Sequence, residues 1–184
     1  MALTMFVDPG LGGTGAAVFQ DIKNGKAEPP IWYDRITIPR ENRTWLDRSI
    51  QVATWVQVII QQMRQKKLVQ WEGLFVEFPE VWGGSLTSNT AVRGGKNGNA
   101  PLLKLASLSG MVVYSFLMGM KTVSSPQVRV QYIKPGEWKG QLKKELVIQR
   151  IRRAYGWVDG EPELRDHEAD AVGMGLAVQK GGKV

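Results

Sequence analysis

Short apolar runs alternate with turn signals at the start of the chain, a pattern that predicts strands joined by hairpins. Strands are expected over 4–8, 15–19 and 31–38, because each run contains β-branched or aromatic residues and is bounded by Gly, Asn or Pro. Asn24-Gly25, between the second and third runs, is a strong hairpin signal. The chain is therefore expected to begin with antiparallel strands.

Helical and strand-like patterns then alternate. Apolar residues recur at helical spacing from a cap at Asn42 or Thr44 to about Lys67, and apolar runs predict strands over 73–78 and 127–132. Further helices are expected over 100–118, 137–155 and 164–179. Hairpin-connected strands followed by alternating helices and strands predict an α/β fold, a mixed five-stranded sheet with helices on both faces.

Two stretches depart from simple amphipathic patterning. The helix over 100–118 is apolar on more than one side, so we expect it to be deeply buried or covered by a partner subunit. The stretch 83–99 is rich in Gly, Ser, Thr and Asn and lacks apolar periodicity, which predicts a mobile surface loop. No repeat or linker divides the chain, and 184 residues fit one domain, 1–184.

Composition narrows the class of protein. The net charge of +7 favours a polyanionic partner such as nucleic acid. The chain has no cysteine, which excludes disulfides and cysteine-based zinc sites. It shows no signal-peptide layout, and no apolar run approaches the ~20 residues of a membrane span. We therefore expect a cytoplasmic protein without a membrane partner.

The first candidate for chemistry is Asp8, at the end of the first apolar run. Pro9 and Gly10 cannot continue a central strand, so Asp8 is expected at the carboxyl edge of the sheet. A buried strand ending in a lone acid is costly unless the acid has a partner such as a metal ion. The glycines that follow let the backbone fold tightly beside whatever Asp8 holds.

The glycine loop also matches two nucleotide-binding patterns. Gly10-x-Gly12-x-x-Gly15 has the letters of the dinucleotide fingerprint, but that motif needs a helix to begin in the loop, and a hairpin is expected here. The loop also resembles the phosphate loop of actin-like ATPases, which start with the same strand and hairpin. Those proteins close two such domains around a nucleotide. That alternative is weaker, because this chain shows one domain, and it stays open.

Three further residues can join Asp8. The strand over 73–78 reaches a second acid, Glu77, just before Pro79. If the two strands are parallel neighbours, both acids lie at one edge of the sheet. His167 and Asp170, three apart on the last helix, share a face that can complete a cluster. Clustered oxygen ligands in a basic protein indicate a Mg²⁺ or Mn²⁺ site acting on phosphate.

The same last helix has residues small enough to lie close to a sheet: Ala169, Ala171, Gly173 and Gly175. A single acid at a strand end or helix start is more often a turn or capping residue than a ligand. We therefore assign Asp166, Glu168 and Glu80 to solvated or capping roles. The coincidence of acids on the right elements is what favours a site.

These residues resemble those of the RuvC-type Holliday-junction resolvases of the ribonuclease H-like superfamily. The resemblance rests on the stretches Asp8-Pro9-Gly10-Leu11…Thr14-Gly15, Val76-Glu77 and His167-Glu168-Ala169-Asp170-Ala171. Weaker similarities are Leu103-Lys104-Leu105…Gly110 and Tyr132…Pro135…Trp138-Lys139. They follow the family's order over nearly the whole chain and imply a ribonuclease H-like fold.

The resemblance implies a metal-binding and catalytic quartet of Asp8, Glu77, His167 and Asp170, where family members carry an acid or a histidine at the third position. Lys139 and one of Lys143 or Lys144 look like the family's phosphate-holding lysines. The family works as a homodimer, paired through a helix like that over 100–118.

Two departures from the family pattern concern the wedge and the loop. Glu80 stands where the family has an aromatic wedge, so Phe78 or Trp82 is the candidate to stack in a junction. For Phe78, packing in the protein core is an equally good interpretation. The glycine-rich stretch 83–99, which carries Arg93 and Lys96, indicates a divergent member, bacterial or phage-encoded.

We therefore expect a hydrolase of DNA recombination and repair, a crossover junction endodeoxyribonuclease that resolves four-way junctions by paired symmetric nicks. Two Mg²⁺ or Mn²⁺ ions per active site would act on the scissile phosphate and leave 5′-phosphate and 3′-hydroxyl ends. The DNA-binding surface is expected to comprise Lys139, Lys143, Lys144, Arg150, Arg152, Arg153, Arg93, Lys96, Phe78 and Trp82. The alternatives are a nuclease-dead module that binds branched DNA and the actin-like nucleotide-binding domain.

Overall fold

A computed structural model of the chain describes residues 1–23, 25–39, 41, 44–78, 100–120, 128–158 and 163–182, without the side chains of 100–102. Its elements are, in order, β1 (Leu3–Asp8), β2 (Gly13–Gln20), β3 (Trp32–Thr37), α1 (Trp45–Gln65), β4 (Trp71–Glu77), α3 (Ala100–Met120), β5 (Arg129–Ile133), α4 (Pro135–Trp138), α5 (Lys144–Tyr155) and α6 (Asp166–Lys180).

The strands form one mixed sheet in the order β3-β2-β1-β4-β5. β1 pairs with β2, and β2 with β3, in antiparallel fashion, while β1 pairs with β4, and β4 with β5, in parallel. The predicted mixed five-stranded sheet is confirmed. Val7 lies opposite Val76 in the ladder, so the next residues, Asp8 and Glu77, are neighbours at one edge.

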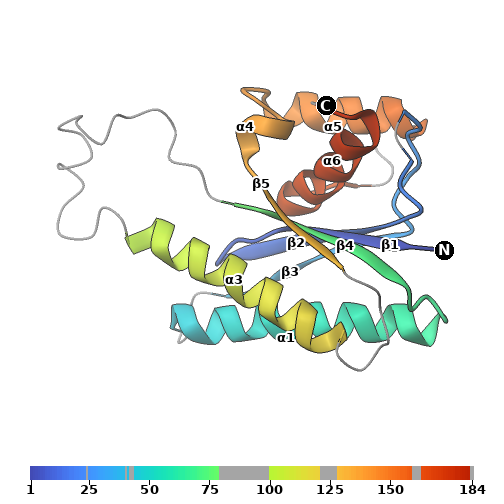
Figure 1. Cartoon of the computed structure of the whole chain (residues 1–184). Coiled ribbons are helices and arrows are strands. Elements are labelled where there is room, and N and C mark those ends of the chain that lie inside the picture. Colours follow the sequence, from blue (N-terminus) through green and yellow to red (C-terminus); the bar gives the residue numbers. More distant parts are fainter. Residues whose placement is uncertain are drawn as a thin grey trace.

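Helices cover both faces of the sheet (Figure 1), as expected. α1 and α3 lie on one face and α5 and α6 on the other, each pair enclosing its own buried cluster. α6 lies close to the sheet because glycines face its bulky neighbours. A Cβ on Gly175 would collide with the Phe19 ring, and one on Gly173 would lie 2.5 Å from the Trp138 ring.

Thr44, one of the two predicted caps, precedes α1 and caps it. The Thr44 hydroxyl accepts a hydrogen bond from the Asp47 N–H, and the Asp47 carboxylate accepts one from the Thr44 N–H. This reciprocal capping box satisfies two helix-terminal donors. The other candidate, Asn42, and the predicted loop over 83–99 lie outside the described residues.

α3 is two-sided, as its sequence predicts. Leu108, Val112 and Phe116 are fully buried, and another side exposes large apolar groups: Leu103, Tyr114 and Leu117. The window Leu103–Met120 has a hydropathy of 1.4 over 18 residues, enough to cross a membrane by length and composition. Our expectation that no run approached that length was therefore wrong. A third of that window, 33%, is buried within the fold.

The single basic helix expected over 137–155 is wrong, because the chain forms two helices there. α4 ends at Trp138, and α5 begins only at Lys144. Gly140 has a φ of 60°, a left-handed conformation that breaks a helix and that glycine adopts at low cost. The break moves Trp138 and Lys139 off the α5 axis, towards the edge where Asp8 and Glu77 lie.

Candidate metal and DNA site

Asp8 and Glu77 end two adjacent parallel strands, so the sheet itself brings these two acids together. The first turns of α6 lie over the same edge and add His167 and Asp170. Asp8 and Asp170 are only 7% and 8% exposed. The structure thus gathers all four residues of the predicted quartet from three elements.

His167 is paired with Asp8. Its Nδ1 lies 2.5 Å from the Asp8 Oδ2, and this bond raises the pKa of the His167 imidazole, outweighing the opposite effect of burial. The glycine loop makes room for this contact. A Cβ on Gly10 would lie 2.8 Å from the His167 ring, and one on Gly15 would collide with the His167 backbone. The glycines predicted to fold beside Asp8 therefore admit His167.

Glu77 is held by Trp138, whose indole Nε1–H donates a hydrogen bond of 2.9 Å to Oε2. Burial, followed by the negative charge of Asp8, raises the pKa of the Glu77 carboxyl to about 7. Asp170 adds to this effect, and the Lys139 ammonium opposes it. The carboxylates are thus close enough that each disfavours ionisation of Glu77.

Asp170 faces two ammonium groups. Its Oδ2 accepts hydrogen bonds from Lys139 at 3.0 Å and from Lys144 at 3.3 Å. Lys139 also lies 3.7 Å from the Glu77 Oε2, and Lys144 lies 3.3 Å from Asp166. Burial lowers the pKa of the Lys139 ammonium, but the charges of Glu77 and Asp170 outweigh it and leave that pKa raised.

The donor set suits a hard divalent cation. Three carboxylates and an imidazole match the ligands that Mg²⁺ and Mn²⁺ accept. The pKa of Glu77 is raised first by burial and then by the charge of Asp8, and a bound cation would oppose both effects. Among the residues that the structure describes, however, no three His, Asp or Glu side chains converge closely enough to hold one ion. Bringing them onto one ion therefore requires a rearrangement of these side chains.

The basic residues of α5 run away from this cluster. Lys144 contacts the site, and Lys143 precedes it with an exposed side chain. Arg150 and Arg153 are also exposed, and Arg152 is half-buried. At 1.5 Å per residue, Arg153 lies about 14 Å along the helix from Lys144. With 3.6 residues per turn, the nine residues between them make about two and a half turns, so Arg153 lies on the opposite side of α5 from Lys144. The exposed arginines therefore form a basic face of α5 that is separate from the lysine at the acids.

The predicted aromatic candidates divide in a similar way. Phe78 follows Glu77 and is half-buried, with its ring packed edge-on against Tyr132 at 5.1 Å between centroids. Trp82, Arg93 and Lys96 lie outside the described residues. Asp166 is exposed and paired with Lys144, and Glu168 caps α6 through the Arg165 N–H, as their predicted roles required. Glu80 lies outside the described residues.

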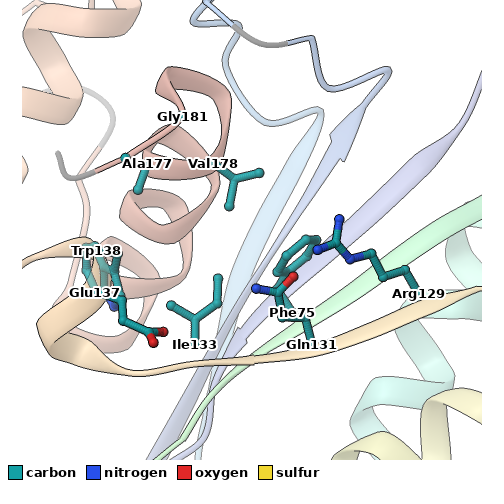
Figure 2. Close-up of a pocket in the computed structure, with 10 residues that line it drawn as sticks. Phe75, Arg129, Gln131, Ile133, Glu137, Trp138, Ala177, Val178 and Gly181 are labelled. Atoms are coloured by element: carbon teal, nitrogen blue, oxygen red, sulfur yellow. The ribbon is translucent and has the colours of Figure 1, made fainter.

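Sequence reasoning did not place Trp138 in the site. The sequence did contain a hint, because Trp138 stands next to Lys139, shortly after the strand predicted over 127–132. Trp138 also forms a wall. It lines a cavity of about 510 Å³ between β5 and the carboxyl end of α6, together with Phe75, Ile133 and Val178 (Figure 2). None of the four site residues lines that cavity.

The fold is similar to that of RuvC from Thermus thermophilus. The chain superposes on the structure of Thermus thermophilus RuvC with a TM-score of 0.58 and 18% identity, over 95% of this chain and 91% of that one. It superposes on T. thermophilus RuvC in complex with a Holliday junction substrate with a TM-score of 0.59 and 19% identity, over 96% and 92%. The ribonuclease H-like fold class is therefore confirmed.

Comparison by sequence adds no assignment. No protein-family model matches the chain, and no curated protein matches it.

Proposed function

We propose that this chain is a divalent-metal-dependent endonuclease that resolves four-way DNA junctions by paired symmetric nicks. The observation that carries the proposal is the gathering of Asp8, Glu77, His167 and Asp170 at one sheet edge, beside two lysines. The RuvC fold supports it, and one of the superposed structures contains a Holliday junction. Acids alone at a strand edge would not favour DNA, but the lysines at the acids and the exposed arginines of α5 favour a polyanionic partner.

The four site residues would hold the metal, two ions per active site. Bound Mg²⁺ or Mn²⁺ would supply Lewis-acid polarisation of the scissile phosphate and activation of water for in-line attack, leaving 5′-phosphate and 3′-hydroxyl ends. Asp8 and Glu77 are fixed by the strands that they end. His167 must present a neutral ring nitrogen to serve as a ligand, so its bond to Asp8 also sets which protonation state is available.

Other residues of the chain position DNA. Lys139 and Lys144 lie at the acids and are placed to hold the scissile phosphate once it reaches the site. Lys143, Arg150 and Arg153 would contact the backbone of a duplex arm further along α5. Lysine and arginine contacts to phosphate give affinity without reading sequence, which suits an enzyme that recognises the shape of a branch.

A homodimer would supply the second nick. A four-way junction needs two symmetric cuts, and a two-fold pair of subunits provides two equivalent sites. The exposed apolar side of α3, with Leu103, Tyr114 and Leu117, is the surface that we assign to this contact. An apolar helix face that remains exposed in one copy indicates a protein interface.

The direct experiment uses synthetic DNA of matched sequence in four forms: a four-way junction, a flap, a fork and a linear duplex. With Mg²⁺ we expect nicks at symmetric positions in opposite strands of the junction, much faster than any cut in the duplex. Tight junction binding without cleavage in Mg²⁺ or Mn²⁺ would instead identify a nuclease-dead binding module. Equal cleavage of all four forms would contradict junction selectivity.

A further inference from the structure

Lys139 occupies a position between two of the acids proposed to hold metal. Its Nζ lies 3.0 Å from the Asp170 Oδ2 and 3.7 Å from the Glu77 Oε2. The side chain is only 21% exposed, and the ammonium lies 4.8 Å from the centroid of the Trp138 ring, which Glu77 also contacts. The amine is therefore held by carboxylates and an aromatic face, and it does not extend into solvent.

A divalent cation and this ammonium would compete for the same oxygen atoms. Two cations on the same carboxylates repel each other strongly in a partly buried site, where the effective dielectric constant is low. A divalent ion on Glu77 and Asp170 therefore requires Lys139 to leave at least one of them.

Lys144 is placed differently. It contacts Asp170 at 3.3 Å and also Asp166, whose side chain is 77% exposed, so it has a second carboxylate outside the cluster. Lys144 can keep an acidic partner when Asp170 turns towards a metal ion. Lys139 has no such outer partner among the interactions of the described residues, since both of its acids belong to the quartet.

We infer that Lys139 is a built-in counter-cation that divalent metal displaces, so that metal loading releases this ammonium to hold a DNA phosphate. The inference rests on the proposed metal-dependent function and adds to it a coupling between metal binding and DNA binding. Without metal, Lys139 is engaged by Glu77 and Asp170 and contributes little to DNA binding. With metal, the freed amine adds one phosphate contact at the point where cleavage occurs.

The first test measures metal binding without DNA. Mn²⁺ is titrated into metal-free protein, and the free ion is followed by electron paramagnetic resonance. Lys139→Met keeps the apolar stem over Trp138 but removes the competing charge, so it should bind Mn²⁺ more tightly than the parent. We expect roughly tenfold to a hundredfold, which is what one charge-assisted hydrogen bond is worth.

Two further variants act as controls in the metal titration. Lys66→Met removes one positive charge at the exposed carboxyl end of α1, on the other face of the sheet, and should leave Mn²⁺ affinity unchanged. Lys139→Arg keeps a cation between the acids and should bind Mn²⁺ about as weakly as the parent.

The second test measures junction affinity against salt concentration, with Ca²⁺ or with EDTA. With Ca²⁺, Lys139→Met should make the slope of log junction affinity against log salt concentration shallower by about 0.9, the value for one phosphate contact. With EDTA it should leave the slope unchanged. Lys143→Met is the matched comparison, because this exposed lysine should flatten the slope equally in both conditions.

The outcomes separate the inference from the proposed function. If the parent binds Mn²⁺ and cuts junctions but Lys139→Met binds Mn²⁺ no tighter than Lys66→Met, the inference is overturned and the nuclease assignment stands. An equal loss of slope for Lys139→Met in Ca²⁺ and EDTA also overturns it. A parent that neither binds Mn²⁺ nor cuts junctions overturns both.

Discussion

The indole Nε1–H of Trp138 donates a hydrogen bond of 2.9 Å to the Glu77 carboxylate. Trp138 is 1% exposed, and its ring packs against Gly173 on α6, where a side chain would leave no room for it. Glu77 is thus fixed from three directions, by its strand, by α4 and by the helix behind the indole. An orienting bond of this kind is what a metal-binding carboxylate requires.

Replacing Trp138 by Phe should weaken metal binding. The ring bulk is largely kept, but Glu77 loses its orienting donor, and such losses cost roughly 10- to 100-fold in metal affinity. Mn²⁺ titration of the metal-free protein is the measurement. Trp71→Phe is a matched control, because Trp71 is equally buried and its Nε1 has no hydrogen-bond partner among the residues that the structure describes. Similar Mn²⁺ affinities for the two variants would show that Trp138 does not support metal binding.

Gly15→Ala should separate α6 from β2. A Cβ at this position would collide with backbone atoms of His167 and Glu168, which cannot move without displacing the helix. We expect the free energy of unfolding to fall by about 3 kcal/mol or more, at the upper end of single-site effects. Gly110→Ala, where an added Cβ meets no atom of the described residues within 4 Å, should instead stabilise α3 by up to about 1 kcal/mol. Chemical denaturation of both variants measures the contrast.

Stability of the metal-free protein should fall as pH rises from 5.5 to 8. The folded-state pKa of Glu77, about 7, lies above its ordinary 4.5, so the folded protein binds more protons in that window than the unfolded chain. The raised pKa of His167 has the same sign, because its stabilising charged form is lost as pH rises through the folded-state value. Both effects come from the site.

Thermal unfolding in EDTA and in Mg²⁺ at the two pH values tests this dependence. In EDTA the melting temperature should be lower at pH 8 than at pH 5.5. Mg²⁺ should narrow or reverse this difference in melting temperature. It binds the ionised form of the Glu77 carboxyl group, so its binding displaces the proton that the metal-free protein holds. A melting temperature in EDTA that rises from pH 5.5 to pH 8 would show that Glu77 is ionised in the folded protein well below pH 7.

Leu117→Arg should convert a dimer into a monomer. Leu117 is 41% exposed on the apolar side of α3, so the substitution should leave the fold intact while burying a charge in any subunit contact. Light scattering on parent and variant measures the mass, and circular dichroism checks the fold. A parent that is monomeric at micromolar concentration and still resolves junctions would contradict the assignment of this surface.

The strand ends that carry the acids were predictable from local sequence. Asp8 directly precedes Pro9 and Glu77 lies two residues before Pro79, and proline cannot continue a central strand. That local signal placed both acids at one edge once the two strands were assumed to be parallel neighbours. The pairing of β1 with β4 confirms that assumption.

What the sequence could not reveal depends on contacts between distant residues. The spacing of His167 and Asp170 suggested that they act together, yet His167 bonds Asp8, and Asp170 is taken by lysines. The helix expected over 137–155 concealed the break at Gly140, because charged and apolar periodicity continues across it. Trp138, at the end of α4 and before that break, reaches Glu77.

Cleavage of a synthetic four-way junction by the parent, Asp8→Asn and Glu77→Gln, each with Mg²⁺ and with EDTA, tests the central claim most directly. The account predicts paired symmetric nicks for the parent with Mg²⁺ only. Both variants should bind the junction at least as tightly as the parent and leave it uncut, because in this account the two side chains hold metal and, without it, repel phosphate. Junction cleavage in EDTA, or at the parent rate by either variant, would contradict the account.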